Sequence, residues 1–253
     1  MSDNHEEVVF TQNDNLVLVS GPTTSGKSMS LYSVRNDPGI WYANCEAGKK
    51  LPFKHKFGQE FVITDPMDIY AIFDEAENRP EIHTIVIDTL TYLMDMFESQ
   101  YVIGQDGYEG WKHYQQYFKN LMQQYISKST KNVIILAHTA TRYDEKEMAN
   151  EVIVPIKGAL KNNGIESYFS MVISTKRVPT KSLKNFENSM LNITEDNEED
   201  GFKHVFQTRL TKDTINERIR GPMAMWSRSE TYIDNDIGHV IKRLQEYYGD
   251  NDE

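Results

Sequence analysis

The chain has 253 residues, of which 39% are hydrophobic and 26% are charged, and its formal net charge is −11. This length can bury a substantial core, and we expect one domain. The negative charge argues against a protein that coats duplex DNA through bulk electrostatics, although a local basic groove remains compatible with it.

The single cysteine and the apolar runs bear on the cellular compartment. Cys45 has no partner for an intramolecular disulfide, and we expect a small buried side chain there. No uninterrupted apolar run approaches the roughly 18 residues needed to cross a bilayer. The start, MSDNHEE, is acidic where a signal peptide is basic. We therefore expect a soluble cytoplasmic protein with no membrane partner.

Apolar runs typical of β-strands recur along the chain. Several are almost continuously apolar, as in parallel strands that are buried on both faces. The predicted strands are Val8–Phe10, Leu16–Ser20, Gly39–Asn44, Glu60–Thr64, Thr84–Asp88, Asn132–His138 and Ser170–Thr175.

Helical patterns lie between these strands. They are predicted for a segment that begins at Lys27, for Asp65–Asn78, and from about Tyr108 to Ser129. Strands that alternate with helices predict an open, mostly parallel, three-layer α/β domain. The last helix has an apolar face with three- and four-residue spacings, formed by Trp111, Tyr114, Phe118, Leu121, Met122 and Tyr125.

The pattern changes after Val178, where the α/β core (about residues 8–178) ends. Residues 179–201 are polar and acidic, which favours a surface insertion or a mobile loop. His204–Thr211 alternates like a strand and INERIRGP follows it, which predicts an antiparallel addition to the sheet. Asp236–Tyr248 reads as a final amphipathic helix. Residues 202–248 are therefore predicted to form a C-terminal β-hairpin and helix.

The segment GPTTSGKS matches the phosphate-binding pattern G-x-x-x-x-G-K-[ST], between an apolar strand and a helix-compatible segment. Its glycines allow successive amides from Thr23 to Ser28 to face phosphate oxygens, and the following helix would add its dipole. Lys27 would reach the β- and γ-phosphates, and the Ser28 hydroxyl would bind Mg²⁺. The predicted nucleotide contacts are Gly21, Pro22, Thr23, Thr24, Ser25, Gly26, Lys27, Ser28 and Met29.

Two acidic residues follow other strands. Asp88 closes TIVID and is placed to hold the hydration shell of Mg²⁺, although a residue there can also be a simple turn residue. Many ATPases have a Glu next to this Asp, but here Thr89 follows, so a general base must come from elsewhere. Glu46 lies just after a strand, at the edge where open α/β sheets bind ligands, and could orient a water. The alternative is a solvated loop glutamate.

The motifs GPTTSGKS, CEAG, IVIDTL and VIILAHT together resemble the RecA-type ATPase core. More narrowly, they resemble the phage RecA-like ATPases associated with the Sak group of single-strand annealing and recombination proteins. The resemblance covers about Leu16–Val178, with a looser continuation through Pro222. It implies a RecA-like P-loop NTPase fold, ATP and Mg²⁺ as cofactors, assembly into a ring or filament, and the host cytoplasm as location.

The resemblance also implies roles for individual residues. Glu46 would be the general base, and His138 would sense the γ-phosphate; a histidine that caps backbone groups is the alternative for His138. QTRLTKDT resembles the strand that carries a basic residue acting on a neighbouring subunit. Lys212 and Arg209 are the candidates for this residue, followed by Lys176 and Arg177, and the alternative is a solvated face.

The stretch Thr139–Gly164 corresponds to the DNA-binding loop of RecA-like proteins. Basic and aromatic side chains there could contact phosphates and stack a base. Acidic residues in the same stretch weaken this case, and a lid over the nucleotide is the alternative. The basic and aromatic residues are Arg142, Tyr143, Lys146, Lys157 and Lys161, and the acidic ones are Asp144, Glu145, Glu147 and Glu151.

The predicted function is Mg²⁺-dependent ATP hydrolysis coupled to binding of single-stranded DNA, in phage-type recombination or annealing. The expected partners are single-stranded DNA, further copies of the chain, and a single-strand-binding or replication protein. Two alternatives stay open. One is a helicase or packaging-type motor, and the other is a nucleotide-dependent switch or loader that binds a protein partner.

Overall fold

The computed structural model describes residues 13–104, 108–145 and 148–249. Its main sheet is built from β1 (Leu16–Gly21), β2 (Ile40–Asn44), β3 (Gln59–Val62), β4 (Thr84–Asp88), β5 (Asn132–His138), β8 (Met171–Pro179), β9 (Phe202–Gln207) and β10 (Tyr232–Asp234). The strand order is β10-β9-β8-β1-β5-β4-β2-β3. The six strands from β8 to β3 are parallel, and β9 and β10 add antiparallel. The predicted α/β class is confirmed, while the predicted strand Val8–Phe10 lies outside the described residues.

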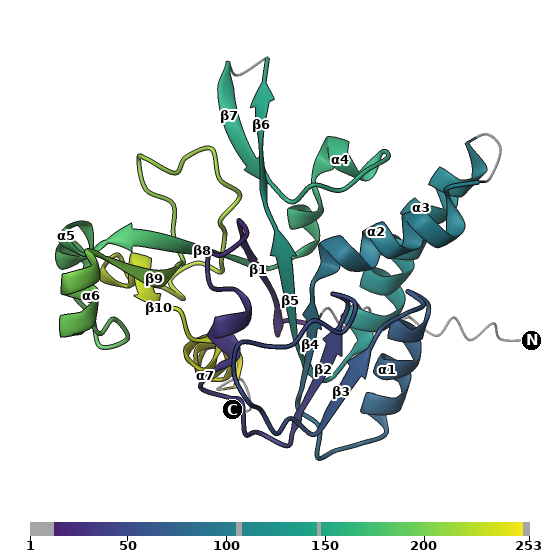
Figure 1. The fold of residues 1–253 in the computed structure, drawn as a ribbon, viewed down its shortest axis with the longest axis horizontal. Helices are drawn as coiled ribbons and strands as arrows, with labels where there is room; N and C mark the ends of the chain where they lie inside the picture. Colours follow the sequence, from purple (N-terminus) through teal and green to yellow (C-terminus); the bar gives the residue numbers. More distant parts are fainter. Residues whose placement is uncertain (1–12, 105–107, 146–147, 250–253) are drawn as a thin grey trace, which may run out of the picture.

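Helices cover both faces of this sheet (Figure 1). Helices α1 (Asp68–Glu77), α2 (Leu90–Tyr101) and α3 (Glu109–Asn120) pack on one face, and α7 (Ile237–Tyr248) packs on the other. Successive strand residues point to opposite faces, so Leu16 and Leu18 enter the first core and Val17 and Val19 enter the second. The result is the predicted three-layer arrangement.

Two of the predicted helices are confirmed, and one helix of the structure was not predicted. The predicted helix at residues 65–78 corresponds to α1, and the one at residues 108–129 corresponds to α3 with its extension through a π-turn (Leu121–Tyr125) and a 3₁₀ turn (Ile126–Lys128). Helix α2 was not predicted, although it follows β4 almost directly. Its buried side has helical spacing and consists of Leu90, Thr91, Leu93, Met94 and Phe97.

The helix predicted from Lys27 is much shorter than expected. It is a four-residue 3₁₀ helix, Ser28–Leu31. The Ser30 hydroxyl donates to the Lys27 carbonyl at 2.6 Å, so a side chain occupies an acceptor that a continuing α-helix would use. Because the helix dipole grows with aligned peptides, the expected dipole contribution to phosphate binding is small here.

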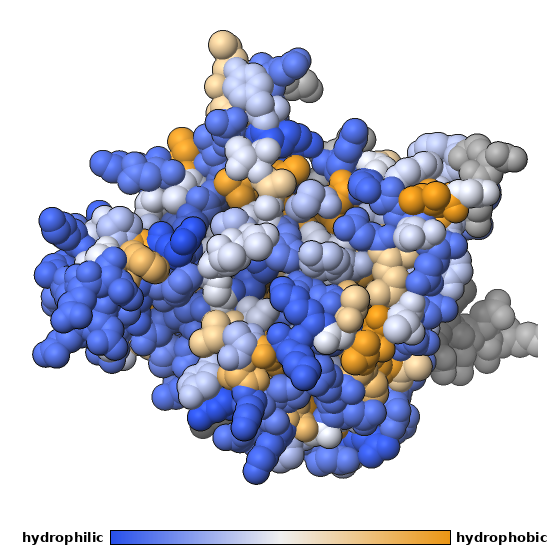
Figure 2. All heavy atoms as spheres, viewed as in Figure 1, coloured by the Kyte–Doolittle hydropathy of each residue, from blue (hydrophilic) through white to orange (hydrophobic). Residues whose placement is uncertain are grey.

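The acidic segment 179–201, for which a surface insertion or a mobile loop is predicted, lies at the surface and contains regular elements. It forms α5 (Thr180–Leu183), a 3₁₀ turn (Lys184–Phe186) and α6 (Glu195–Asp200), at the surface on the left of Figure 1. Figure 2 shows this part as mostly hydrophilic. The segment is nevertheless anchored, because Leu183 is fully buried against residues of β8, β9 and β10. Thr194 and Asn197 form a capping box at the start of α6.

The remaining elements extend from the sheet. Strands β6 (Ala140–Asp144) and β7 (Ala149–Ile153) form a hairpin that projects beyond β5 (Figure 1). Helix α4 (Leu160–Asn163) and a 3₁₀ turn at Ile165–Tyr168 follow the hairpin, and another 3₁₀ turn lies at Ser229–Thr231.

The second strand of the C-terminal addition is β10. INERIRGP instead makes only isolated bridges, through Glu217 and Arg220. Within the described ranges, no helix is long and apolar enough to cross a membrane.

The docking of the acidic segment can be tested with Leu183→Ala. Removing this fully buried side chain should lower the free energy of unfolding by about 2–5 kcal/mol, because a cavity replaces its contacts. Urea denaturation measures the change. Leu210→Ala is the matched control, because Leu210 is 46% exposed and should cost no more than about 0.5 kcal/mol. Equal effects of the two substitutions would contradict the docked segment.

Candidate functional site

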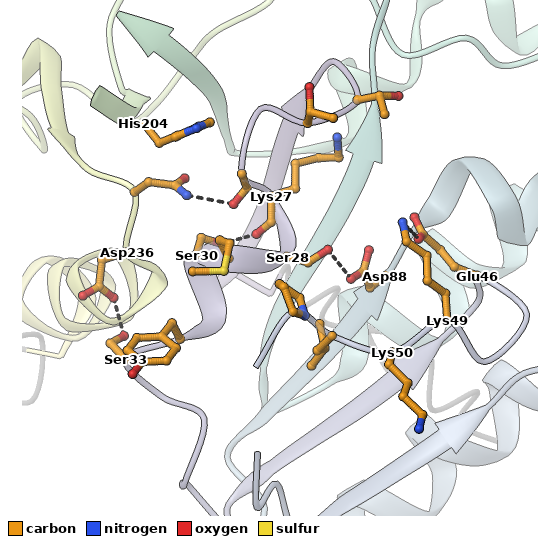
Figure 3. Close-up of a pocket in the computed structure, with 18 of the residues that line it drawn as sticks. Lys27, Ser28, Ser30, Ser33, Glu46, Lys49, Lys50, Asp88, His204 and Asp236 are labelled. Carbon is orange, nitrogen blue, oxygen red and sulfur yellow. Dashed lines mark hydrogen bonds and ion pairs between the residues drawn. The ribbon is translucent and has the colours of Figure 1, made fainter. Parts of the chain in front are cut away.

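A cleft of about 680 Å³ opens where the carboxyl ends of β1, β2, β4 and β5 meet. Open α/β sheets bind ligands at this edge. In Figure 3, Lys27, Ser28 and Asp88 lie in the middle of the cleft, with Glu46 on one side and His204 and Asp236 on the other. Six of the nine predicted nucleotide contacts line it, namely Thr23, Thr24, Gly26, Lys27, Ser28 and Met29. Gly21, Pro22 and Ser25 belong to the loop but do not line the cleft.

Asp88 and Ser28 are brought together as predicted. The Ser28 hydroxyl donates to Asp88 Oδ2 at 2.9 Å, and the Tyr42 hydroxyl donates to the same oxygen at 2.8 Å. Asp88 is only 2% exposed. Burial raises the pKa of Asp88, and the hydrogen bond from Tyr42 opposes this rise. Tyr42 was not predicted, because an aromatic residue inside an apolar strand reads as core.

The donor set at Asp88 fits Mg²⁺. Asp88 Oδ1 is buried and has no hydrogen-bond partner among the described residues, so one carboxylate oxygen remains for a ligand. Hydroxyl and carboxylate oxygens are ligands that Mg²⁺ accepts, and Mg²⁺ usually takes only one or two protein ligands beside phosphates and water. No cluster of three or more His, Cys, Asp or Glu side chains suited to a metal occurs in the described part of the chain.

The Lys27 ammonium is held inside its own loop. It donates to the carbonyl oxygens of Gly21 at 2.8 Å and Pro22 at 2.9 Å. Burial lowers the pKa of Lys27 to about 8, against the opposing attraction of Asp88 and Glu46. The side chain lines the cleft and is therefore placed to exchange these carbonyl partners for phosphate oxygens.

Glu46 lies in the cleft with two partners. Its carboxylate accepts from Lys49 Nζ at 2.7 Å and from His138 Nε2 at 3.3 Å. Burial raises the pKa of Glu46, but the hydrogen bonds from Lys49 and His138 outweigh it and leave the pKa below its ordinary value. Glu46 is therefore an ionised carboxylate at neutral pH, and the description as a free solvated glutamate does not apply.

His138 ends β5 and contacts Glu46 with its side chain instead of capping backbone groups. A carboxylate only accepts, so His138 Nε2 must carry the hydrogen in this contact. Burial and the nearby charge of Lys27 lower the pKa of His138, so the ring is neutral at pH 7. Its other nitrogen, Nδ1, is buried without a hydrogen-bond partner within the described residues. The neutral imidazole thus joins the Glu46 carboxylate to the end of β5.

The C-terminal elements form a second wall of the cleft that was not predicted. His204 Nδ1 donates to the Ser25 carbonyl at 2.7 Å, and Asn235 Nδ2 donates to the Gly26 carbonyl at 2.7 Å. Gly26 has φ +105°, and a Cβ there would lie 2.8 Å from Asn235 Nδ2, so only glycine allows this approach. Asp236 caps α7 and accepts from Ser33. These contacts join residues about 180 or more positions apart, and no local pattern marks them.

The predicted trans-acting residues lie outside the cleft. Strand β9 ends at Gln207, so Arg209 and Lys212 belong to the following loop, and both are exposed. Arg209 donates to the Trp226 carbonyl at 2.7 Å. Lys176 is tied to Glu217 at 2.5 Å, and Arg177 is exposed on β8.

The predicted DNA-binding stretch forms the projecting hairpin and the segment after it. Arg142 pairs with Glu151 at 3.3 Å, and Lys157 pairs with Glu98 at 2.6 Å. Tyr143 is 57% exposed, whereas Lys146 and Glu147 lie outside the described residues. No residue of the hairpin described by the structure lines the cleft, so the alternative of a lid is not supported in this conformation.

The lowered pKa of Lys27 predicts an unusual pH dependence of stability. Between about pH 8 and about pH 10.5 the unfolded chain keeps a proton that the folded chain has lost, so this lysine makes stability rise with pH. The free energy of unfolding of the natural chain, relative to Lys27→Met, should therefore increase between about pH 7.5 and about pH 10. Urea denaturation of both proteins without nucleotide measures it.

Lys54→Met provides the control for this prediction, because Lys54 is exposed and lies outside the cleft. Its difference from the natural chain should stay constant over the same pH range. A constant difference for Lys27→Met as well would show that the buried ammonium keeps its ordinary pKa.

A comparison with family models agrees with this geometry. The model of the AAA domain matches residues 13–209, which is most of the chain and includes the phosphate loop, Glu46, Asp88 and His138. No curated protein matches the chain. Because the match covers well over half of the sequence, the chain belongs to the AAA domain family of P-loop ATPases.

Proposed function

We propose that the protein hydrolyses ATP with Mg²⁺ and couples this reaction to binding of single-stranded DNA in phage-type recombination or strand annealing. The observation that carries the ATPase part is the convergence of Lys27, Ser28, Asp88, Glu46 and His138 on one cleft. These residues come from four different strand ends, and they supply a phosphate cation, hard oxygen ligands and an ionised carboxylate together.

Each of these residues has its own role in the proposed reaction. Lys27 neutralises charge on the β- and γ-phosphates, and Ser28 and Asp88 would hold Mg²⁺, which when bound offsets charge that develops on the phosphates. Glu46 takes a proton from a water whose oxygen forms a bond to the terminal phosphorus. The bond from that phosphorus to the bridging oxygen breaks, and ADP leaves with the electron pair. His138 keeps the Glu46 carboxylate at the end of β5.

Lys212 is the proposed contribution from a neighbouring subunit. A residue that acts on another copy has to be exposed and remote from its own cleft, and Lys212 meets both requirements. Arg209 and Lys176 are already engaged by Trp226 and Glu217. A ring or filament of copies would place this loop against the next cleft.

The hairpin is the proposed DNA contact. A single residue, Thr139, separates His138 at the end of β5 from the start of β6, so a change at the terminal phosphate has a short route to the hairpin. Exposed Tyr143 can stack on a base, and Arg142 and Lys161 can contact phosphates. The expectation that a single-strand-binding or replication protein is a partner depends on this proposed DNA contact.

A nucleotide-dependent switch or loader is the second candidate function. It is favoured by the ion pairs Arg142–Glu151 and Lys157–Glu98, because basic residues that are already paired attract phosphates less. In that case the hairpin would bind a protein partner. A helicase or packaging-type motor has no specific observation in its favour.

Glu46→Gln tests the hydrolytic role. The variant should bind ATP about as well as the natural chain, while phosphate release falls by a factor on the order of 100 or more, because the amide cannot accept the proton of the attacking water. Glu75→Gln is the control, since Glu75 is exposed on α1, pairs with Arg79 and does not line the cleft. Turnover that survives in Glu46→Gln would remove Glu46 from the mechanism.

The ATPase rate with and without single-stranded DNA separates the two candidate functions. We expect DNA to raise the rate of the natural chain, and we expect Arg142→Ala combined with Lys161→Ala to weaken DNA binding and flatten its salt dependence. Lys242→Ala, on α7 far from the hairpin in Figure 1, is the control. An unchanged rate together with no DNA retention favours the switch or loader.

A further inference from the structure

The turn after β2 brings Lys49 back to Glu46. Asn44, the buried last residue of β2, accepts from the Glu46 amide at 3.1 Å and donates to the Lys49 carbonyl at 3.0 Å. The Lys49 amide also donates to the Glu46 carbonyl at 3.0 Å. One buried amide side chain thus holds both ends of the turn, so its shape is fixed before any ligand binds.

The backbone inside this turn is left-handed. Ala47 has φ +52° and Gly48 has φ +74°, a region that side chains with a Cβ rarely adopt. Two such residues in succession reverse the chain over a short distance. This reversal places Lys49 Nζ 2.7 Å from Glu46 Oε2, and Figure 3 shows the two side chains meeting at the edge of the cleft while Lys50 points away.

The pair differs from an ordinary surface ion pair. The Lys49 side chain is 72% exposed, but that of Glu46 is 10% exposed, and the second oxygen of Glu46 is held by His138. Exposed pairs between two flexible side chains contribute little to stability. Here one partner is fixed from two directions within the cleft, so the contact determines where the carboxylate points.

We propose that Lys49 is a positioning residue for hydrolysis, which fixes the orientation of the Glu46 carboxylate in the cleft. The inference rests on the proposed ATPase function and adds a residue supplied by the same chain. Lys49 acts through Glu46. Its positive charge also lowers the pKa of Lys27 and the pKa of His138.

The charges around Glu46 single out Lys49. The titratable groups that interact with the carboxylate are Lys49, His138, Lys27, Asp88, Tyr42 and Cys45. Asp88 is a like charge, and Lys27 donates to its own loop. His138 is neutral at pH 7, because burial and Lys27 lower its pKa. Lys49 is therefore the full positive charge that contacts Glu46.

The test compares Lys49→Met with Lys54→Met, an exposed lysine of the same connection that does not line the cleft. We expect kcat of Lys49→Met to fall about ten- to hundredfold at neutral pH with little change in KM for ATP, because the base is misplaced while nucleotide contacts remain. The acidic limb of its kcat profile should move to higher pH, because the Glu46 pKa rises without Lys49. Lys49→Arg should restore both, and Lys54→Met should change neither.

A double-mutant cycle decides whether Lys49 acts through Glu46. In single-turnover measurements, Lys49→Met should add no further loss to Glu46→Gln, because the carboxylate that it positions is absent. Losses that multiply would overturn the inference and indicate direct contact with phosphate. An unchanged pH profile in Lys49→Met would overturn it as well. A natural chain that binds ATP without hydrolysing it would instead contradict the proposed function.

Discussion

The buried carboxylate of Asp88 is the constraint on which the site depends. An ionisable group at 2% exposure is costly unless hydrogen bonds compensate for lost hydration. Ser28 supplies one from the phosphate loop, and Tyr42 supplies another from β2. These bonds join the phosphate loop and β2 to the end of β4 at one oxygen. The position of the phosphate loop and the position of the acid are therefore set by the same interaction.

Charges of both signs surround this carboxylate. Lys27 lies in the phosphate loop, Asp88 and Glu46 lie beside it, and Lys49 lies at the outer edge. Burial pushes each group toward its neutral form, and each opposite neighbour counteracts that effect. Because the groups interact within one cleft, the protonation state of each depends on the others. A bound nucleotide carries several negative charges and would therefore shift the pKa values of all these groups together.

The sequence predicted the parts of the site that follow apolar strands. Each of Glu46, Asp88 and His138 ends such a strand or comes shortly after it, and parallel strands bring their carboxyl ends to one edge. Tyr42 escaped prediction because its ring packs in the core while only its hydroxyl reaches the site. The short helix at Ser28 depends on a side-chain hydrogen bond, and the position of the acidic segment depends on a few apolar residues that dock on β8 and β9. The first is a local side-chain contact and the second is a set of tertiary contacts, and the pattern of apolar residues contains neither.

The second wall of the cleft changes how the C-terminal part of the chain should be understood. Asn235 and Asp236 lie beyond residue 209, where the family match ends, yet Asn235 contacts the phosphate loop and both line the cleft. The surroundings of the loop are thus completed by residues that lie outside the matched range. Asp234, Asn235 and Asp236 line the cleft together with the phosphate loop, so a substitution at the C-terminal end of the chain can change the surface that a nucleotide would meet while the phosphate loop stays the same.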